Sequence, residues 1–389
     1  MNQKKTAPLW TAPFVLLLVI NIFNATAGQM TFPLVAKFSL SLGADLTLAS
    51  TTAGLMSLAA LFVCPFAGVI SDYFSRKKIL QVCSIAYAVS LLLHAFCGSM
   101  PLLIILRLVT GIFFSVINVT VVAFSSAFIP KERMAEGLGY AGLANILAQA
   151  LGPALSLELV DRFGYPACFM AAAGCALTAF LFLFVMPAGE AETPSGAPRK
   201  ITLSSIFAWD FFLFMLLSVL FASCSSMILT YLAIIGDERS IPNIALFFTI
   251  YSLGMVVMRP FTGKFMDKFG VYKTVIPAIV AGSISIIMVG LSYTLPLMLI
   301  ASILMAIGQG AGTPSLQADT IKKLDKARAG VATSTIQIGM NIGHAFSPMI
   351  GSFFVTAYGY EKMLCGFGAV LFFGGFLLLY LQYRKEQKA

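Results

Sequence analysis

Charged residues are scarce in this sequence. Asp, Glu, Lys and Arg together make up 11% of its 389 residues, whereas they make up about 25% of an average soluble protein. Only 16 residues are acidic, while 59% are hydrophobic and the mean hydropathy is +0.92. A water-soluble fold of this length has too little interior to hide so many apolar side chains. The composition therefore excludes a disordered chain, a nucleic-acid-binding domain and an ordinary cytosolic enzyme, and it indicates that lipid surrounds most of the protein.

Signatures of catalysis and of metal binding are also missing. The sequence contains no His-Glu-x-x-His, no Gly-x-Ser-x-Gly and no phosphate loop of the Gly-Lys-Ser/Thr type. The seven cysteines are scattered through apolar stretches without metal-ligand spacing, so we interpret them as small core residues rather than disulfides or ligands. We therefore expect neither a cofactor, nor a metal, nor enzymatic activity.

Long apolar runs are what the sequence has instead. A helix needs about 20 apolar residues to cross the hydrocarbon layer of a membrane. The chain divides into twelve such runs, which are separated by short polar breaks. They lie near 9–36, 46–71, 78–98, 101–128, 134–160, 164–186, 205–235, 242–267, 272–292, 295–320, 329–357 and 360–382. We therefore predict an all-α membrane protein with twelve transmembrane helices.

The basic residues indicate how these helices are oriented. If the N-terminus is cytoplasmic, 19 of the 25 Lys and Arg residues fall in loops on the inner side and four on the outer side, while Arg107 and Arg259 lie inside spans. Cytoplasmic loops of membrane proteins carry an excess of Lys and Arg. We therefore expect both termini in the cytoplasm, and the formal charge of +9 reflects topology rather than a binding site for a polyanion.

The two halves of the chain repeat each other at a constant offset of 195 residues. This offset relates Gly68 to Gly263, Asp72 to Asp267, Pro65 to Pro260, Arg133 to Arg328, Pro153 to Pro348 and Gly164 to Gly359. We predict two six-helix bundles, residues 1–188 and 205–389, joined by a polar cytoplasmic linker over 189–204. Parallel repeats of this kind place a substrate site between the halves, near the middle of the membrane.

Three segments resemble the signatures of a known family. The segment GVISDYFSRKK at 68–78 is similar to the loop motif of the major facilitator superfamily, with a Gly, an Asp four residues on and a basic cluster. Ile105 to Gly111 resembles the intramembrane Arg motif of that family, and Gly139 to Ser156 resembles the antiporter signature of its drug:proton branch. The resemblance implies two pseudo-symmetric bundles of six helices, alternating access and coupling to protons.

The resemblance favours a secondary active transporter as the function. It implies proton-coupled efflux of small hydrophobic or amphiphilic compounds by a monomer in a bacterial plasma membrane. Ala148 and Ser156 stand where the antiporter signature has glycine, so a proton-coupled transporter of sugars or small metabolites, importing or exporting, stays the alternative. A membrane sensor that does not transport would need an appended soluble domain, for which the tails and the linker are too short. Without a nucleotide motif, the energy must come from an ion gradient.

Charged residues at the cytoplasmic helix ends are candidates for latches that hold one state of the transport cycle closed. An Asp at such a position pairs with a basic residue or with the positive end of a neighbouring helix dipole. The candidate latch residues are Gly68, Asp72, Arg76, Arg133, Gly263, Asp267 and Arg328. For the neighbouring lysines, solvated loops on the inner side are the simpler interpretation.

Arg107 is the residue that is most costly to place in the membrane. An Arg near the middle of a span costs about 2.5–3.5 kcal/mol on insertion scales, so it must face a cavity or a partner. In a hairpin of the fourth and fifth spans it lies near Glu158, which makes Glu158 a candidate proton carrier. His344 is another, because it titrates near neutral pH and lies deep in a span, whereas we expect His94 near an outer end. A structural, hydrogen-bonded role is the simpler alternative for each of them.

Polar side chains recur at helical spacing along several spans, most clearly in the fifth and eleventh, which are equivalent in the repeat. The candidate cavity residues are Asn21, Asn24, Gln29, Asn118, Asn145, Gln149, Tyr231, Tyr251, Gln309, Thr313, Gln337 and Asn341. Gly152, Pro153 and Pro348 would allow these two helices to bend. Any one polar residue could instead bond a neighbouring helix, but the matched stripes favour a neutral, amide-rich substrate cavity.

Overall fold

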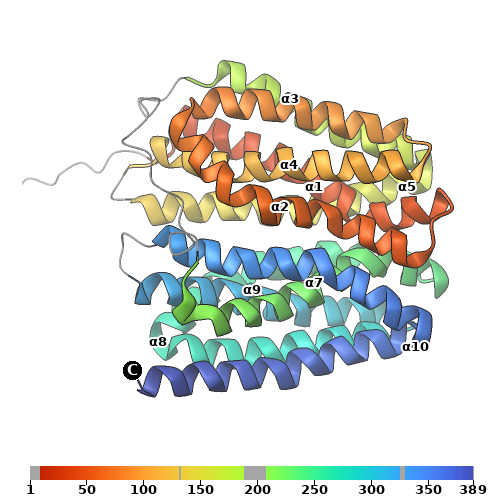
Figure 1. The fold of residues 1–389 in the computed structure, drawn as a ribbon, viewed down its shortest axis with the longest axis vertical. Coiled ribbons are helices and arrows are strands. Elements are labelled where there is room, and N and C mark those ends of the chain that lie inside the picture. The colour runs from red at the N-terminus through yellow and green to blue at the C-terminus, as the bar shows by residue number, and fades with distance from the viewer. Residues whose placement is uncertain (1–8, 131–132, 188–206, 325–328, 389) are drawn as a thin grey trace, which may run out of the picture. The chain divides into compact units, whose positions relative to one another are not determined.

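The computed structural model of the protein describes residues 9–130, 133–187, 207–324 and 329–388. Every regular element in these ranges is a helix (Figure 1). The long helices are α1 (Ala12–Ser41), α2 (Leu46–Tyr73), α3 (Arg76–Ala95), α4 (Met100–Ser125), α5 (Met134–Val185), α7 (Phe212–Glu238), α8 (Leu246–Leu291), α9 (Leu295–Lys323) and α10 (Ala329–Lys388). Two short 3-10 helices, η1 (Ser126–Phe128) and η4 (Trp209–Phe211), follow α4 and precede α7. The predicted linker over 189–204 lies outside the described ranges.

Within the described part of the chain, nine helices are long and apolar enough to cross a membrane. This is fewer than the twelve runs of the sequence, because α5, α8 and α10 each include two runs and a glycine of non-helical φ and ψ between their two arms. The pairs are 134–160 with 164–186 in α5, 242–267 with 272–292 in α8, and 329–357 with 360–382 in α10. The all-helical membrane architecture is thus confirmed, whereas the count of twelve transmembrane helices stays a prediction.

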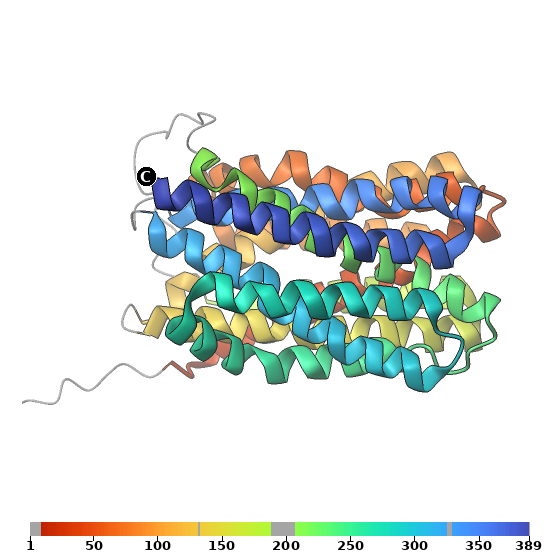
Figure 2. The ribbon, with the colours of Figure 1, turned by 90° about the horizontal axis from the view of Figure 1, so that it is seen from below.

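A glycine interrupts each of these three long helices. Gly164, Gly270 and Gly359 have φ of +80°, +79° and +82°, with ψ close to 180°. Only glycine adopts this conformation without strain, because it has no Cβ. At the break of α10 the chain turns back, and the two arms of the helix run alongside each other (Figure 2). Gly164 and Gly359 are 195 residues apart, so the same break recurs at equivalent places of the repeat.

The break in α8 has a different counterpart in the first half. The residue 195 positions before Gly270 is Ser75, which has a negative φ and caps the N-terminus of α3 by accepting a hydrogen bond from the Lys78 N–H at 3.4 Å. A Ser side chain at this position satisfies a free N–H of the helix and so begins a new helix. The same place in the repeat thus carries a capping Ser between α2 and α3 and a glycine of positive φ between the two arms of α8.

The chain forms two compact units, and the first comprises residues 1–31 and 62–198. Within it α3 packs against α4 and α5. Basic side chains fasten its helix ends: Arg76 Nη1 donates to the Ala123 carbonyl at 2.9 Å, and Lys77 Nζ donates to the Met186 carbonyl at 2.5 Å. Each of these bonds ties the start of α3 to the end of a helix beside it.

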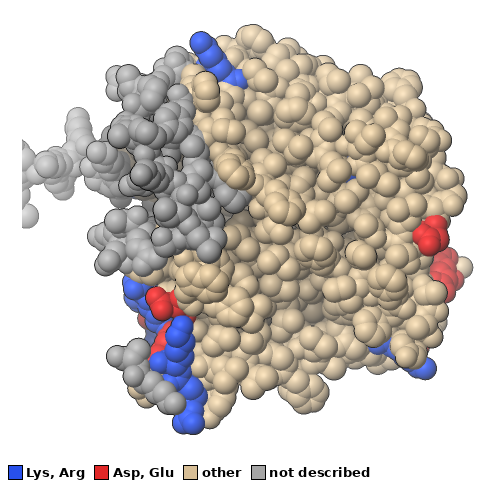
Figure 3. All heavy atoms as spheres, viewed as in Figure 1, with Lys and Arg blue, Asp and Glu red and all other residues tan. Residues whose placement is uncertain are grey.

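The second unit comprises residues 32–61 and 199–389. Its most extensive packing joins α8 to α9 and α7 to α10. Its helices approach closely where glycines face each other or a backbone, as at Gly308, where a Cβ would lie 2.8 Å from Gly282 Cα. Figure 3 shows a surface on which uncharged side chains predominate and the charged ones lie towards the edges, as expected of helices in contact with lipid.

The second unit therefore takes in the end of α1 and the start of α2. Lys37 forms a 2.6 Å ion pair with Asp237, and Gly54 packs so closely on Ala345 that any side chain there would overlap the Ala345 carbonyl. These contacts group 32–61 with the second half of the sequence. The bundle boundaries at 188 and 205 stay a prediction.

Candidate coupling and substrate sites

Arg107 lies in the first half of α4 and its side chain is completely buried. Its Nη1 donates to the Thr31 hydroxyl of α1 at 3.2 Å. Gly28 makes room for this arrangement, since a Cβ there would lie 2.6 Å from the Phe114 ring and 3.2 Å from the Tyr87 hydroxyl. The predicted intramembrane Arg thus faces a polar interior formed by α1, α3 and α4.

Three residues after Arg107, a cluster of hydrogen-bonded hydroxyl groups joins α4 to α3. Thr110 donates to the Ser90 hydroxyl at 3.1 Å, and Ser90 donates to the Tyr87 carbonyl at 2.8 Å. His94 Nδ1 lies 2.7 Å from the Ser90 carbonyl. Since hydroxyl groups both donate and accept, this cluster is suited to hold a charged group away from lipid.

His94 lies in the last turn of α3, as expected of a residue near one end of its span. The ring is completely buried and lies 5.2 Å from the Phe169 ring of α5. This burial was not predicted, because the expectation considered the depth of the residue in its span but not the face of the helix. The signal was present: Tyr87, Ser90 and His94 follow the i, i+3, i+7 spacing of one helix face.

Glu158 is not brought to Arg107, contrary to the hairpin estimate. Its side chain is 60% exposed and forms an ion pair with Arg162, one turn further along α5. That expectation rested on the positions of Arg107 and Glu158 along their helix axes. The direction in which a side chain points also depends on the rotation of its helix. The residues found around Arg107 are hydroxyl-bearing and aromatic ones instead.

The contact between α1 and α5 gathers most of the predicted amides of the first unit. Asn21 Nδ2 donates to the Ala141 carbonyl at 3.2 Å, and Asn145 donates to the same carbonyl at 3.4 Å. Further along, Gly152 packs so tightly on Gln29 that any side chain at 152 would overlap it. Small residues let helix backbones approach in this way.

Two amides between these contacts, the buried Asn24 and the partly buried Gln149, have buried polar atoms without a partner. Both polar atoms of Asn24 and the Oε1 of Gln149 form no hydrogen bond with any residue that the structure describes. Leaving a buried polar group unpaired costs about 1–3 kcal/mol. Such a group is retained where water or a ligand satisfies it. The other predicted amide of this unit, Asn118, is satisfied locally by donating to the Phe114 carbonyl at 2.9 Å.

In the second unit, His344 lies where α10 packs against α7. Its Nε2 is 3.2 Å from the Ser225 hydroxyl, and its Nδ1 is 2.9 Å from the Met340 carbonyl of its own helix. Ser226 donates to its backbone carbonyl at 3.2 Å. Both ring nitrogens therefore have a partner within hydrogen-bonding distance, and a protonated ring would have to use at least one of these contacts differently.

A small cavity of about 10 Å³ opens beside His344. It is lined by Phe32 and Ser57 from the first two helices, and by Ser226, Thr230 and His344 from α7 and α10. This volume is about that of a single water. Four of the seven lining residues carry polar side chains, and the others are Phe32, Ala53 and Leu229. The cavity is therefore suited to a hydrogen-bonded water or a polar group of a ligand.

Tyr231 links α7 to two other helices instead of lining an open pocket. It is completely buried, and its hydroxyl lies 2.8 Å from the Ser50 hydroxyl and 2.6 Å from the Pro348 carbonyl. Pro348 itself lacks the N–H that would bond the preceding turn of α10. Tyr231 thereby fastens α10 at the predicted bending position.

The remaining predicted cavity residues occupy several helices of the second unit. Gln309 of α9 donates to the Phe221 carbonyl of α7 at 2.7 Å, and Gln337 lies 3.5 Å from Asn341 along α10. Thr313 and Asn341 are buried, Tyr251 is partly buried, and Gln337 is exposed. The Gln309 bond joins α9 to α7, whereas the contact of Gln337 stays within α10.

The candidate latch residues are described only in part. Asp267 is exposed and forms no ion pair with another described residue, and a Cβ at Gly263 would meet open space. Arg133 stands directly before the first turn of α5. Arg328 and the side chain of Asp72 lie outside the residues that the structure describes. Arg76 donates to the Ala123 carbonyl at the end of α4.

An acidic and basic cluster that the sequence reasoning did not single out lies at the ends of α9 and α10. Lys323 Nζ lies 2.8 Å from Asp319 and 2.7 Å from Glu386, and the Tyr272 hydroxyl donates to Glu386 at 2.6 Å. The i, i+4 spacing of Asp319 and Lys323 was a signal for the first of these pairs. Nothing local in the sequence marks Glu386 as their partner, 63 residues further on.

Comparison with known proteins agrees with this architecture. The family model of the Major Facilitator Superfamily matches residues 17–242 and 214–389. The chain is 26% identical over 365 residues to the uncharacterized MFS-type transporter YuxJ of Bacillus subtilis, covering 86% of this chain and 88% of YuxJ. It is 22% identical to the multi-drug resistance efflux pump PmrA of Streptococcus pneumoniae, covering 88% and 89% of the two chains.

Solved structures show the same fold at lower identity. A crystal structure of a variant of the nucleoside transporter NupG is similar with a TM-score of 0.80 and 14% identity, covering 94% of this chain and 99% of that one. The family model covers nearly the whole sequence, and the described helices have the fold of the family. The protein therefore belongs to the Major Facilitator Superfamily of membrane transporters.

Proposed function

We propose that the protein exports small hydrophobic or amphiphilic compounds in exchange for protons, by alternating access in a cell membrane. The similarity to PmrA, which is named a multidrug efflux pump, supports efflux. The resemblance of residues 139–156 to an antiporter signature supports exchange for protons. An ion gradient is a sufficient source of energy, because one charge that crosses 100 mV supplies about 2.3 kcal/mol.

The proposed topology has twelve crossings with both termini in the cytoplasm. Dividing α5, α8 and α10 at Gly164, Gly270 and Gly359 turns the nine long helices into twelve segments. Each break coincides with a polar interruption between two apolar runs of the sequence. The excess of Lys and Arg on one side supports the orientation. The protein is proposed to act as a monomer.

The observation that carries the proposal of a substrate site is the pair of unsatisfied amides, Asn24 and Gln149. Asn24 belongs to α1 and Gln149 to α5. The close contact of Gly152 with Gln29 fixes the register of these two helices against each other. A substrate that carries a hydrogen-bonding group could satisfy both amides while its apolar part contacts the surrounding helices. In this proposal the two amides orient the substrate and the remaining cavity residues form the walls.

Proton coupling is proposed to use Arg107 and His344. The fixed charge of Arg107 disfavours a second positive charge in the polar interior of the first unit. His344 is the one histidine of the chain with both ring nitrogens near a partner and a polar cavity beside it. Glu158 has no part in this proposal, because its carboxylate lies in an exposed ion pair.

Transport of a sugar or another small metabolite is the second candidate. The amide-rich interior favours it, because Asn and Gln both donate and accept hydrogen bonds as the hydroxyls of such solutes do. A mainly hydrophobic substrate would depend less on these amides. The two candidates therefore differ in the effect expected from removing them.

Counterflow with purified protein in vesicles tests this proposal. We expect Asn24→Ala and Gln149→Ala each to lower the apparent affinity for a transported compound about 5- to 10-fold, the equivalent of one hydrogen bond. Thr178→Ala is the matched control, because Thr178 is exposed and bonds Gly174 of its own helix. Unchanged affinity in both amide variants for every compound in a panel of drugs, sugars and amino acids would refute the proposed substrate site.

A further inference from the structure

A large groove lies in the second unit, apart from the candidate cavity residues. It measures about 520 Å³ and lies between the two arms of α8 and the middle of α9. Its walls are apolar, with Met258, Phe261 and Phe265 from the first arm of α8, Pro277 from the second arm and Ala311 from α9. The volume falls within the about 300–1,000 Å³ that is typical of small-ligand sites.

Aromatic side chains form one continuous stripe along this groove. Phe261, Phe265 and Phe269 follow each other at four-residue spacing, and all three are exposed by more than two fifths of their surface. The rings of Phe265 and Phe269 are 4.6 Å apart. A stripe of this kind offers a track for an extended hydrocarbon chain.

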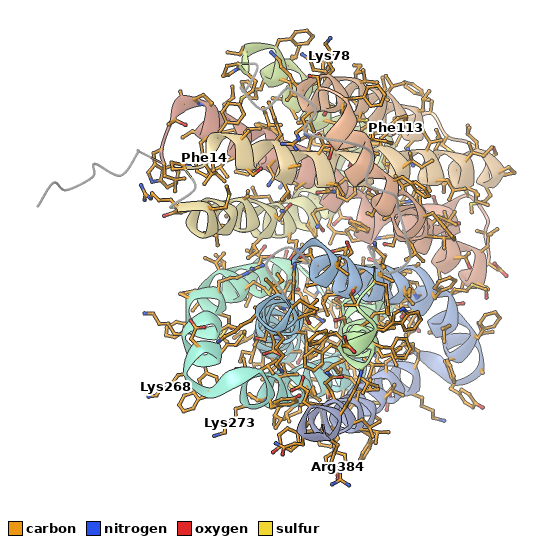
Figure 4. The ribbon with its side chains drawn as sticks, turned by 60° about the vertical axis from the view of Figure 1, so that its left-hand side comes forward. Phe14, Lys78, Phe113, Lys268, Lys273 and Arg384 are labelled. Carbon is orange, nitrogen blue, oxygen red and sulfur yellow. The ribbon has the colours of Figure 1, made fainter. Side chains whose placement is uncertain are left out.

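Lysines line one end of the groove. Lys264 and Lys268 are exposed and belong to the lining, and Lys268 Nζ lies 5.2 Å from the centre of the Phe269 ring. Figure 4 shows Lys268 and Lys273 on the two sides of the break in α8, pointing away from the helices. Asp267 is the one acidic residue between 258 and 278, so this end of the groove is positively charged.

A buried hydroxyl provides an independent sign of a ligand. Thr262 lines the groove, is only 7% exposed and has an Oγ1 without a hydrogen-bond partner among the residues that the structure describes. The other hydroxyl of the groove, on Thr274, is satisfied by the Gly270 carbonyl at 2.8 Å. An unsatisfied donor in an otherwise apolar groove calls for an acceptor atom from outside the protein.

We propose that this groove binds one anionic phospholipid. The phosphate would lie at Lys264 and Lys268, a glycerol ester oxygen would accept from Thr262, and an acyl chain would follow the phenylalanine stripe. Basic pockets between membrane helices on the cytoplasmic side bind anionic head groups in the same way. The position in the cytoplasmic leaflet depends on the proposed orientation, whereas the binding itself is independent of transport.

Native mass spectrometry of the full-length protein tests the binding. The delipidated protein in neutral detergent is titrated with phosphatidylglycerol and, separately, with zwitterionic phosphatidylcholine. We expect one phosphatidylglycerol to bind at least tenfold more tightly than phosphatidylcholine. Since each lysine near a membrane surface contributes about 1 kcal/mol, Lys264→Gln with Lys268→Gln should weaken binding about 25-fold. Lys78→Gln with Lys362→Gln removes the same charge from exposed positions elsewhere and should have no effect.

A second variant places the lipid inside the groove. Thr262→Val keeps the shape of the side chain and removes its donor, and should weaken binding about 5-fold, the equivalent of one hydrogen bond. In a background with Trp10→Phe and Trp209→Phe, Phe265→Trp should be quenched by phosphatidylglycerol with brominated acyl chains, and the quenching should saturate at one lipid per protein.

Several results would overturn the proposal. One is equal binding of the two lipids, and another is an equal loss of lipid affinity in Lys264→Gln with Lys268→Gln and in the control Lys78→Gln with Lys362→Gln. Unchanged lipid affinity of Thr262→Val, or displacement of the lipid by inorganic phosphate alone, would also contradict it. None of them depends on whether vesicles containing the protein transport any compound, so a failure here leaves the proposed function untouched.

Discussion

At the scale of single residues, Arg107 is the side chain whose surroundings the sequence predicts most directly. The cost of an intramembrane charge, about 2.5–3.5 kcal/mol, predicted that it faces a polar partner. The structure supplies the hydroxyl of Thr31. That Arg107 faces a polar partner was predictable, because it follows from the energetic cost of a charge in lipid. The identity of the partner was not predictable, because it depends on how the neighbouring helices are rotated. Glu158, for example, lies on an exposed face of α5.

The first prediction concerns Arg107 itself. Arg107→Ala should abolish proton-coupled transport, because it removes the buried charge and its hydrogen bond to Thr31. Arg107→Lys should retain part of the activity, since it keeps the charge but not the planar donor array. Transport by the Ala variant at the wild-type rate would contradict the role. Counterflow by the Ala variant then separates the two functions: its survival would assign Arg107 to proton coupling, and its loss to the common conformational cycle.

The two histidines are predicted to have different roles. His344→Gln should uncouple transport from the proton gradient while counterflow continues, because Gln keeps a hydrogen bond to Ser225 but does not titrate. His94→Gln should mainly lower the midpoint of thermal unfolding, because His94 is buried against Phe169. Coupling is measured as the ratio of protons to substrate. Normal coupling in His344→Gln together with lost coupling in His94→Gln would reverse this assignment.

Glu386 gives a prediction on pH. Burial raises the pKa of its carboxyl, but hydrogen bonds from Lys323, Tyr272 and Gln382 outweigh burial, so the pKa lies below its ordinary value. The last predicted span ends before this residue, at 382. A lowered pKa means that the interaction stabilises the fold at neutral pH and that this contribution is lost as the pH falls through the folded-state pKa.

The contribution of Glu386 is measurable by thermal unfolding. Because the side chain is partly exposed, we expect Glu386→Gln to cost at most about 1 kcal/mol at pH 7. The difference from the wild type should shrink as the pH falls below the ordinary glutamate pKa of about 4.3. A constant difference between pH 7 and pH 3 would show that the loss arises from packing and not from charge.

At the scale of the helices, the sequence predicts the apolar segments well and their connections less well. The runs at 46–71 and 295–320 correspond closely to α2 and α9. In α5, α8 and α10 a glycine at positive φ joins the two arms without a loop, and this was not predicted. The pattern of hydrophobicity marks where a segment is polar but does not distinguish such a break from a turn.

A glycine substitution tests the role of these breaks. Gly359→Ala should destabilise the protein by about 1–3 kcal/mol, because a Cβ strains the backbone at φ +82° although the surrounding space is open. Gly366→Ala is the control: it lies within a regular part of α10 and also meets open space, so it should be neutral or stabilising by up to about 1 kcal/mol. Equal unfolding midpoints for the two variants would contradict the account of the break.

At the scale of the whole molecule, the internal repeat and the motifs were sufficient to predict the superfamily, which the family model confirms. The grouping of 32–61 with the second unit was not predictable, because Tyr231 meets Ser50 across 181 positions of sequence. Substrate and direction of transport depend on cavity shape at the level of single atoms. The stripes of Asn and Gln indicate only that hydrogen bonding is available there.

The internal pH of vesicles tests the central claim, proton-coupled exchange, most directly. Vesicles containing the purified protein are loaded with an acidic buffer and a pH-sensitive dye, placed in a more alkaline medium and offered one compound at a time. The account predicts that a transported amphiphilic compound raises the internal pH as protons leave in exchange, and that vesicles containing Arg107→Ala show no rise. Counterflow of the same compound without any change in internal pH would contradict it.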